Sequence, residues 1–197
     1  MLQTAGVEVD DRGIGTQQDA QIVLPLSRFQ SETDVTGLVE RVTDHLAAGT
    51  LGGGNIIPVI GDVFAELANN AVQHSESPVG AFGFIQFRQT QKGRRFVCVV
   101  ADGGIGIRKS LERNPNLNAL VPYDWTAIER ALEERVSGTG DATRGIGLYA
   151  VAEEMQLAGR QMIIHSGQGM MSVSALDDRA QRTTLFPGTL ISVEIPT

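Results

Sequence analysis

A carboxylate, an amide and an imidazole recur at four-residue steps within one stretch of the chain, as Glu66, Asn70 and His74. Residues four apart lie on the same face of an α-helix. Apolar residues recur around them at steps of three and four, which predicts a buried helix face beginning at Ile57. A carboxylate beside a neutral oxygen ligand can activate a nucleophile and help to hold Mg²⁺, which takes few protein ligands. Alone, the same pattern also fits a solvated helix face.

The composition limits the partners that this chemistry could serve. With 197 residues, 42% of them hydrophobic and 20% charged, the chain is long enough for a domain with a complete core. A net charge of -7 argues against sequence-independent nucleic-acid binding, which needs a surplus of Lys and Arg. The single cysteine, Cys98, cannot form an internal disulfide, and no apolar run approaches the length of a membrane span. We therefore expect a cytoplasmic protein with no nucleic-acid or membrane partner.

The expected elements define one domain over residues 21–197, preceded by a polar leader, 1–20, that we expect to be flexible. In chain order the sequence predicts strand 21–26, a helix from Ser31 or Thr33 to Gly49, a helix from Ile57 to about Ser75, strands 82–90 and 95–101, an irregular insertion 108–143, a helix from Arg144 to Gly159, a hairpin over 162–175 that turns about 167–169, and a final strand 188–196. This order predicts an α+β fold, in which helices cover one face of a mixed, mostly antiparallel sheet as a two-layer α/β sandwich.

Two glycine-rich turns stand at places where a ligand could meet backbone. The apolar strand 95–101 leads directly into Asp102-Gly103-Gly104-Ile105-Gly106-Ile107, a carboxylate followed by a flexible turn. The insertion 108–143 then holds a short amphipathic helix capped by Asp124 and is bounded by glycines. Its length and composition are typical of a movable lid, although an ordinary surface excursion has the same features.

The second turn, Arg144-Gly145-Ile146-Gly147-Leu148, opens the helix that follows the insertion. No G-x-x-x-x-G-K-[ST] motif occurs in the chain, which excludes a P-loop. The residues from Gly145 to Ala150 formally match G-x-G-x-x-A of a dinucleotide-binding fold. They follow a polar turn instead of a strand, and no acidic residue ends a second strand about 20 positions later, so this interpretation is disfavoured.

Four motifs in order carry a resemblance to a known family. They are Glu-x-x-x-Asn-Ala-x-x-His from Glu66, Asp-Gly-Gly-Ile-Gly-Ile from Asp102, Arg-Gly-Ile-Gly-Leu from Arg144, and the terminal Gly-Thr-Leu-Ile-Ser-Val-Glu-Ile-Pro from Gly188. Together they resemble the GHKL ATPase superfamily, the nucleotide-binding domain shared by gyrase, Hsp90, sensor histidine kinases and MutL. The compact order of elements looks most like the anti-sigma-factor serine kinases, with the histidine kinase catalytic domain next. The resemblance implies a Bergerat-type fold with an ATP lid at 108–143.

The resemblance also implies roles for individual residues. Asn70 would be the Mg²⁺ ligand, Glu66 the base that orients or deprotonates the attacking hydroxyl or water, and Asp102 the acceptor for the adenine amino group. The other implied nucleotide-binding residues are His74, Gly104, Gly106, Ile107, Arg144, Gly145, Ile146, Gly147, Leu148 and Thr189. A carboxylate at position 102 would meet the O6 acceptor of guanine with no proton between them. Losing such a bond costs about 10 to 150-fold in affinity, so ATP is expected to win over GTP.

Some assignments stay open at this stage. Arg144 is equally well a solvated arginine, Thr189 a plain residue at the start of a strand, and His74 a side chain packed behind the site. Gln73 stands where many histidine kinases carry Lys or Arg, and the phosphoacceptor helix of a histidine kinase is missing.

Two functions follow from the resemblance. One is a stand-alone serine protein kinase or ATPase that uses ATP and Mg²⁺ and acts on a protein partner in signal transduction: a sigma factor, an anti-anti-sigma-like protein or a response protein. The alternative is an ATP-gated binding switch with little or no phosphoryl transfer. The carboxylate at Glu66 favours chemistry, because binding alone does not require it. Whether the chain forms a homodimer is left open.

Overall fold

Five strands form one sheet in this computed structural model, which describes residues 20–48, 56–133, 136 and 147–197. The elements are β1 (Ala20–Phe29), α1 (Glu32–Ala48), α2 (Ile56–His74), β2 (Ala81–Thr90), β3 (Gly93–Asp102), α3 (Gly106–Leu111), α4 (Pro115–Asn118), α5 (Asp124–Ala131), α6 (Gly147–Met155), β4 (Gln161–Val173) and β5 (Arg179–Pro196). The spatial order of the strands is β1-β2-β3-β5-β4. The predicted leader, 1–20, lies outside the described residues except for its last position.

Every neighbouring pair of described strands is antiparallel, so the prediction of a mixed sheet is wrong in that respect. Helices α3 to α6 separate β3 from β4 along the chain, and helical crossovers commonly join parallel neighbours. In the structure β5 lies between these two strands and runs opposite to both. The α+β class and the predominance of antiparallel pairing are confirmed.

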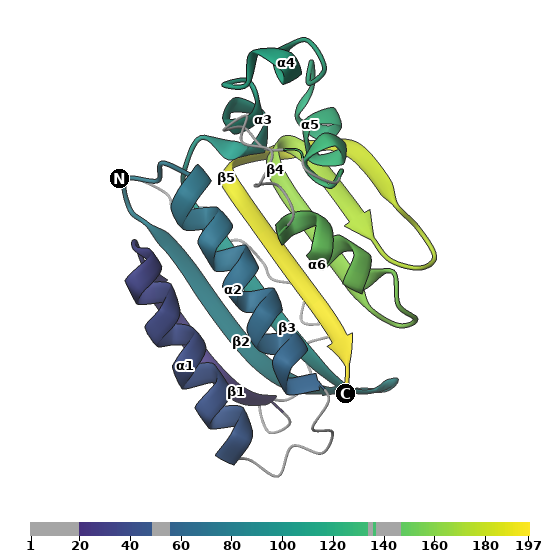
Figure 1. The fold of residues 1–197 in the computed structure, drawn as a ribbon. Helices are drawn as coiled ribbons and strands as arrows, with labels where there is room; N and C mark the ends of the chain where they lie inside the picture. Colours follow the sequence, from purple (N-terminus) through teal and green to yellow (C-terminus); the bar gives the residue numbers. More distant parts are fainter. Residues whose placement is uncertain (1–19, 49–55, 134–135, 137–146) are drawn as a thin grey trace, which may run out of the picture.

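Helices α1, α2 and α6 lie across one face of the sheet, whereas α3, α4 and α5 gather at the end where β3 finishes (Figure 1). The main core fills the space between these helices, α1, α2 and α6, and the sheet. Side chains on both layers are completely buried, including Phe64 and Ile85. A small second cluster of Leu111, Val121 and Ala127 holds the short helices together. The two-layer arrangement therefore follows from apolar faces that must be covered.

Helix α2 is fixed on the sheet by its apolar face. Phe64 meets Phe29 of β1 edge to face, with ring centroids 6.4 Å apart, and neither side chain is exposed by more than 1%. Leu67 and Ala71 continue the same buried face toward the C-terminal end of the helix. Because these contacts fix the rotation of α2, they also fix the direction in which its polar residues point.

Helix α1 begins at Glu32, directly after Ser31, which is one of the two predicted capping residues. The Ser31 hydroxyl accepts a hydrogen bond from the Asp34 backbone N–H at 3.1 Å, and the Asp34 carboxylate accepts from the Ser31 N–H at 3.0 Å. This reciprocal arrangement satisfies amides that the helix itself leaves unpaired. Helix α5 differs from its prediction: Asp124 is its first residue and Tyr123 is the N-cap, while the Asp124 carboxylate accepts a bond from the Gln168 N–H at 2.7 Å.

The predicted hairpin about residues 167–169 does not form. Strand β4 is continuous and pairs with β5 along its length, with register shifts at Gly167 and Gly169. A Cβ at position 169 would lie 2.6 Å from the backbone of Asp124. The glycine at position 169 therefore makes room for the start of α5, and the turn of the β4–β5 hairpin falls at residues 174–178.

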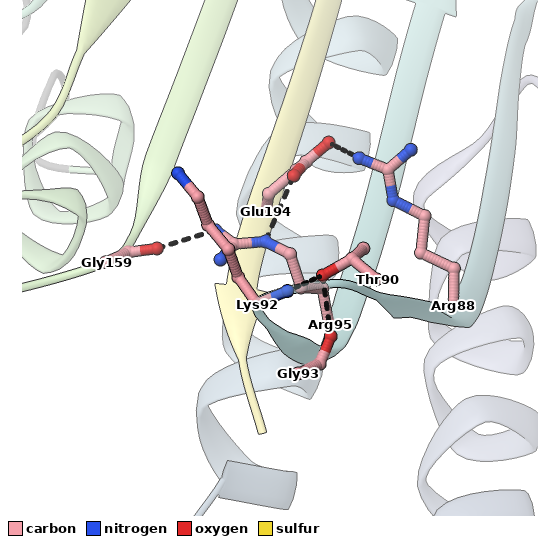
Figure 2. A network of polar contacts seen from close by, with 7 residues as sticks. All are labelled: Arg88, Thr90, Lys92, Gly93, Arg95, Gly159 and Glu194. Carbon is pink, nitrogen blue, oxygen red and sulfur yellow. Dashed lines mark hydrogen bonds and ion pairs between the residues drawn. The ribbon is translucent and has the colours of Figure 1, made fainter. Parts of the chain in front are cut away.

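The start of β3 and the end of β5 are joined by a polar network (Figure 2). The carboxylate of Glu194 pairs with Arg88 and with Arg95, whose Nε lies 3.1 Å from Glu194 Oε2. Arg95 also donates to the carbonyl of Gly159 at 2.6 Å. Glu194 is thus satisfied by two guanidinium groups that come from neighbouring strands.

Candidate functional site

A pocket opens where the last turns of α2 meet the end of β3 and the middle of β5. The space between its walls, counted together with the open solvent at its mouth, is about 800 Å³. Leu67, Val100 and Ile191 give it apolar walls. Seven of the residues predicted for the site line it: Asn70, His74, Asp102, Gly106, Ile107, Leu148 and Thr189.

Helix α2 carries the first group of these residues. Asn70 and His74 are half-buried and line the pocket, one helical turn apart, because the face of Leu67 and Ala71 is held against the core. Glu66 lies one turn earlier and is exposed. The predicted polar row therefore runs along the edge of the pocket, with Glu66 outside its lining.

Glu66 lies against the start of α6. A Cβ at Gly147 would come within 2.0 Å of Glu66 Oε2 and 3.8 Å of Asn70 Nδ2, so both side chains approach this glycine closely. Leu148, the next residue of α6, lines the pocket. The other members of this predicted turn, Arg144, Gly145 and Ile146, lie outside the described residues.

The side-chain amide of Asn70 has a buried nitrogen, Nδ2, with no hydrogen-bond partner among the residues that the structure describes. Rotation of the amide by a half-turn would place its oxygen at the same position, since the two atoms are nearly equivalent in shape. A buried polar atom without a partner is costly unless a ligand satisfies it. Asn70 therefore fits a role as an oxygen ligand. Within the described residues, no cluster of three or more His, Cys, Asp or Glu side chains could hold a metal ion by itself.

Asp102 is the last residue of β3 and stands opposite Thr189 of β5. Its side chain is only 8% exposed, and its Oδ1 accepts the N–H of Gly104 at 2.8 Å. Burial raises the pKa of this carboxyl above its ordinary value, against the opposing effect of the backbone N–H groups of Gly104 and Thr189. No ion pair joins it to a cation within the described part of the chain. Asp102 is thus a buried acceptor facing the pocket.

Gly104 does not line the pocket, and glycine is required at position 104 for a different reason. A Cβ at this position would lie 1.9 Å from the carbonyl oxygen of Ser75, and the next residue, Ile105, donates its N–H to that oxygen at 2.8 Å. The turn after β3 is therefore docked on the end of α2. Gly106 and Ile107 follow at the wall of the pocket.

Ser166 of β4 lies behind the pocket wall, against lining residues, and the sequence did not reveal it. It is 2% exposed, and its hydroxyl lies 3.1 Å from Thr189 Oγ1, 3.1 Å from the Gly188 carbonyl and 2.9 Å from the Ile107 nitrogen. The predicted hairpin placed Ser166 next to a turn and hid its inward-facing position in a continuous strand. Strand alternation from Met162 and Ile164 is the signal that could have found it.

The described part of the predicted lid, 108–133 and 136, consists mostly of short packed helices. Ile128 of α5 is fully buried in the main core, and Ala131 and Val136 line the pocket. The rest of the 108–143 segment lies outside the described residues. Movement of this segment with nucleotide stays a prediction.

Comparisons with known proteins do not assign a function to this pocket. In the described ranges, no helix combines the length and apolar character needed to cross a membrane. No protein-family model matches this chain, and no curated protein is significantly similar to it.

Proposed function

We propose that this chain binds Mg·ATP in the pocket at the end of α2 and transfers the γ-phosphoryl group to a hydroxyl of a protein partner. The supporting observation is convergence: seven residues chosen from sequence motifs line one pocket although they come from four separate segments, namely Asn70, His74, Asp102, Gly106, Ile107, Leu148 and Thr189. The substrate class is carried over from the resemblance to the anti-sigma-factor serine kinases, so a sigma factor, an anti-anti-sigma-like protein or a response protein is the proposed partner.

The proposed adenine contact is the carboxylate of Asp102. It is buried, faces the pocket and has backbone donors but no cation as partners in the described residues. Apolar walls from Leu67, Val100 and Ile191 suit the faces of a purine ring. A carboxylate acceptor at this position selects a purine that presents an amino group.

The proposed phosphate end is the region of Asn70, Glu66 and Gly147. Asn70 would hold the metal ion through its amide oxygen after a half-turn of the amide brings that oxygen to the position of the partnerless nitrogen Nδ2. When bound, Mg²⁺ neutralises charge on the phosphates. The backbone N–H groups at the start of α6, a helix of nine residues, point a positive dipole end toward the same region. Glu66 touches the start of this helix and in this proposal would orient or deprotonate the attacking hydroxyl.

A direct test is amide chemical-shift mapping of the whole chain with Mg²⁺ and a non-hydrolysable ATP analogue. We expect the largest shifts at Gly104, Gly106 and Thr189 and none at Gly93, which starts β3 at the opposite end of the sheet. An absence of saturable shifts, or shifts centred on Gly93 and Glu194, would reject the pocket as the nucleotide site.

A further inference from the structure

The hydroxyl of Ser166 lies at the junction of three elements behind the pocket. It contacts the Ile107 nitrogen of α3 at 2.9 Å, the Gly188 carbonyl of β5 at 3.1 Å and the hydroxyl of Thr189 at 3.1 Å. With 2% of the residue exposed, bulk water does not compete for these bonds. All hydrogen-bonding capacity of this hydroxyl is therefore used inside the protein.

A count of protons fixes the direction of each bond. A serine hydroxyl has one proton and two acceptor lone pairs. The Ile107 N–H can only donate and the Gly188 carbonyl can only accept, so Ser166 gives its proton to Gly188 and uses one lone pair for Ile107. Its second lone pair faces Thr189 Oγ1. The proton in that bond must therefore come from Thr189.

This direction decides what Thr189 presents to the pocket that it lines. Its only hydroxyl proton is directed at Ser166, so toward the ligand it offers lone pairs alone. Asp102, its partner across the β3–β5 ladder, is an acceptor as a carboxylate. This end of the pocket then contains two neighbouring acceptors.

We propose that Ser166 is a positioning residue that holds Thr189 as an acceptor and thereby sharpens selection of a 6-amino purine over a 6-oxo purine. The inference rests on the proposed nucleotide function, and it adds a determinant of specificity that touches no ligand. A 6-amino group brings two N–H donors to this end of the pocket, whereas a 6-oxo group brings only acceptor lone pairs. A Thr189 hydroxyl released from Ser166 could rotate and donate to that oxygen.

The test compares ATP with ITP. The bases of these two nucleotides differ in the group at the purine 6-position and in the proton on ring N1. Affinities for the Mg²⁺ complexes are measured by calorimetric titration for wild type, Ser166→Ala and the control Ser172→Ala. Ser172 lies on the same strand, but its hydroxyl accepts from Gln161. We expect Ser166→Ala to lower the ATP-to-ITP affinity ratio about fivefold, the value of one neutral hydrogen bond. Ser172→Ala is expected to leave the ratio unchanged.

Thr189→Val is a second variant that tests the same inference, and its result does not depend on whether Ser166→Ala folds. It removes the hydroxyl while keeping its shape, so it should lower the ratio in the same direction. In the Thr189→Val background, Ser166→Ala should produce no further change in the ratio. An unchanged ratio in both single variants, with affinity for the two nucleotides lost equally, would overturn the inference and leave nucleotide binding intact. Failure of wild type to bind either nucleotide would overturn the proposed function and this inference together.

Discussion

The two ends of the β3–β5 ladder carry one carboxylate each, and the protein treats them differently. At the end near the start of β3, Glu194 is paired with Arg88 and Arg95. At the other end, Asp102 is more deeply buried but has only backbone N–H groups as partners among the described residues. The two residues share a sheet, a pair of strands and a formal charge, but differ in whether a cation is present.

This difference separates a charge that serves the fold from one that is available to a ligand. Two guanidinium groups already satisfy Glu194, so it gains little from a further partner. Asp102 pays the cost of desolvation without a counter-charge, and burial raises its pKa. A costly acceptor at a pocket is a feature typical of functional sites. Substitutions at one end of the ladder at a time separate the two roles.

The largest expected effect is on turnover. Glu66→Ala removes the proposed base near the pocket end and should lower phosphate release from ATP by about 10² to 10⁴-fold, with nucleotide affinity retained. Glu194→Ala should leave the rate unchanged, because that carboxylate is far along the ladder from the pocket. Release of labelled phosphate is measured for both variants at saturating ATP. Equal rates in wild type and Glu66→Ala would reject the role of Glu66, and binding without turnover in either would favour the ATP-gated switch.

The next effect is on stability at the pocket end. Gly104→Ala places a Cβ against the carbonyl of Ser75, and we expect it to lower the free energy of unfolding by about 1 to 3 kcal/mol. Gly37→Ala in α1 is the control, since a Cβ there meets nothing within 4 Å and alanine favours a helix. Urea denaturation compares the two variants. A Gly104→Ala protein as stable as wild type would show that the turn after β3 does not depend on this close approach.

Removal of the paired carboxylate should have a smaller effect on stability. Glu194→Ala breaks two partly exposed ion pairs and is expected to cost about 1 kcal/mol. High salt should weaken the contribution of these pairs, whereas ATP affinity should not change in this variant. The same urea series, run at low and high salt, measures the difference. A loss of ATP affinity without loss of stability would contradict the contrast between the two ends.

The smallest expected effect is a pH dependence set by Asp102. Its pKa in the folded protein is raised above the ordinary value of 3.8, so the native state binds the proton more tightly than the unfolded chain. The protonated carboxyl therefore stabilises the fold at acid pH, and this contribution is lost as the pH rises through the raised pKa. Asp102→Asn should be more stable than wild type at neutral pH, with a difference in stability that narrows as the pH falls through the raised pKa toward the ordinary value. A difference in the free energy of unfolding that widens on acidification would contradict a raised pKa at Asp102.

Local patterns in the sequence were sufficient for much of the site. The helical spacing of Glu66, Asn70 and His74, and the position of Asp102 at the end of an apolar strand, depend on residues that are close in the chain. Periodicity therefore predicted the elements that carry them and the face on which they lie.

Local sequence patterns do not predict contacts between segments that are distant in the chain. The sequence pattern predicts a turn at Gly169, but the small size of this residue makes room for Asp124, 45 positions earlier in the chain. The same error hid Ser166, whose three partners come from α3 and β5. The order of strands, with β5 between β3 and β4, likewise depends on pairing that no local pattern encodes.

The central claim, that the uncompensated carboxylate at the end of β3 recognises ATP, is tested most directly by calorimetric titration of wild type and Asp102→Ala with Mg·ATP. The account predicts saturable binding by wild type and a loss of about 10 to 150-fold in affinity for the variant. No binding by wild type, or equal binding by both proteins, would contradict it.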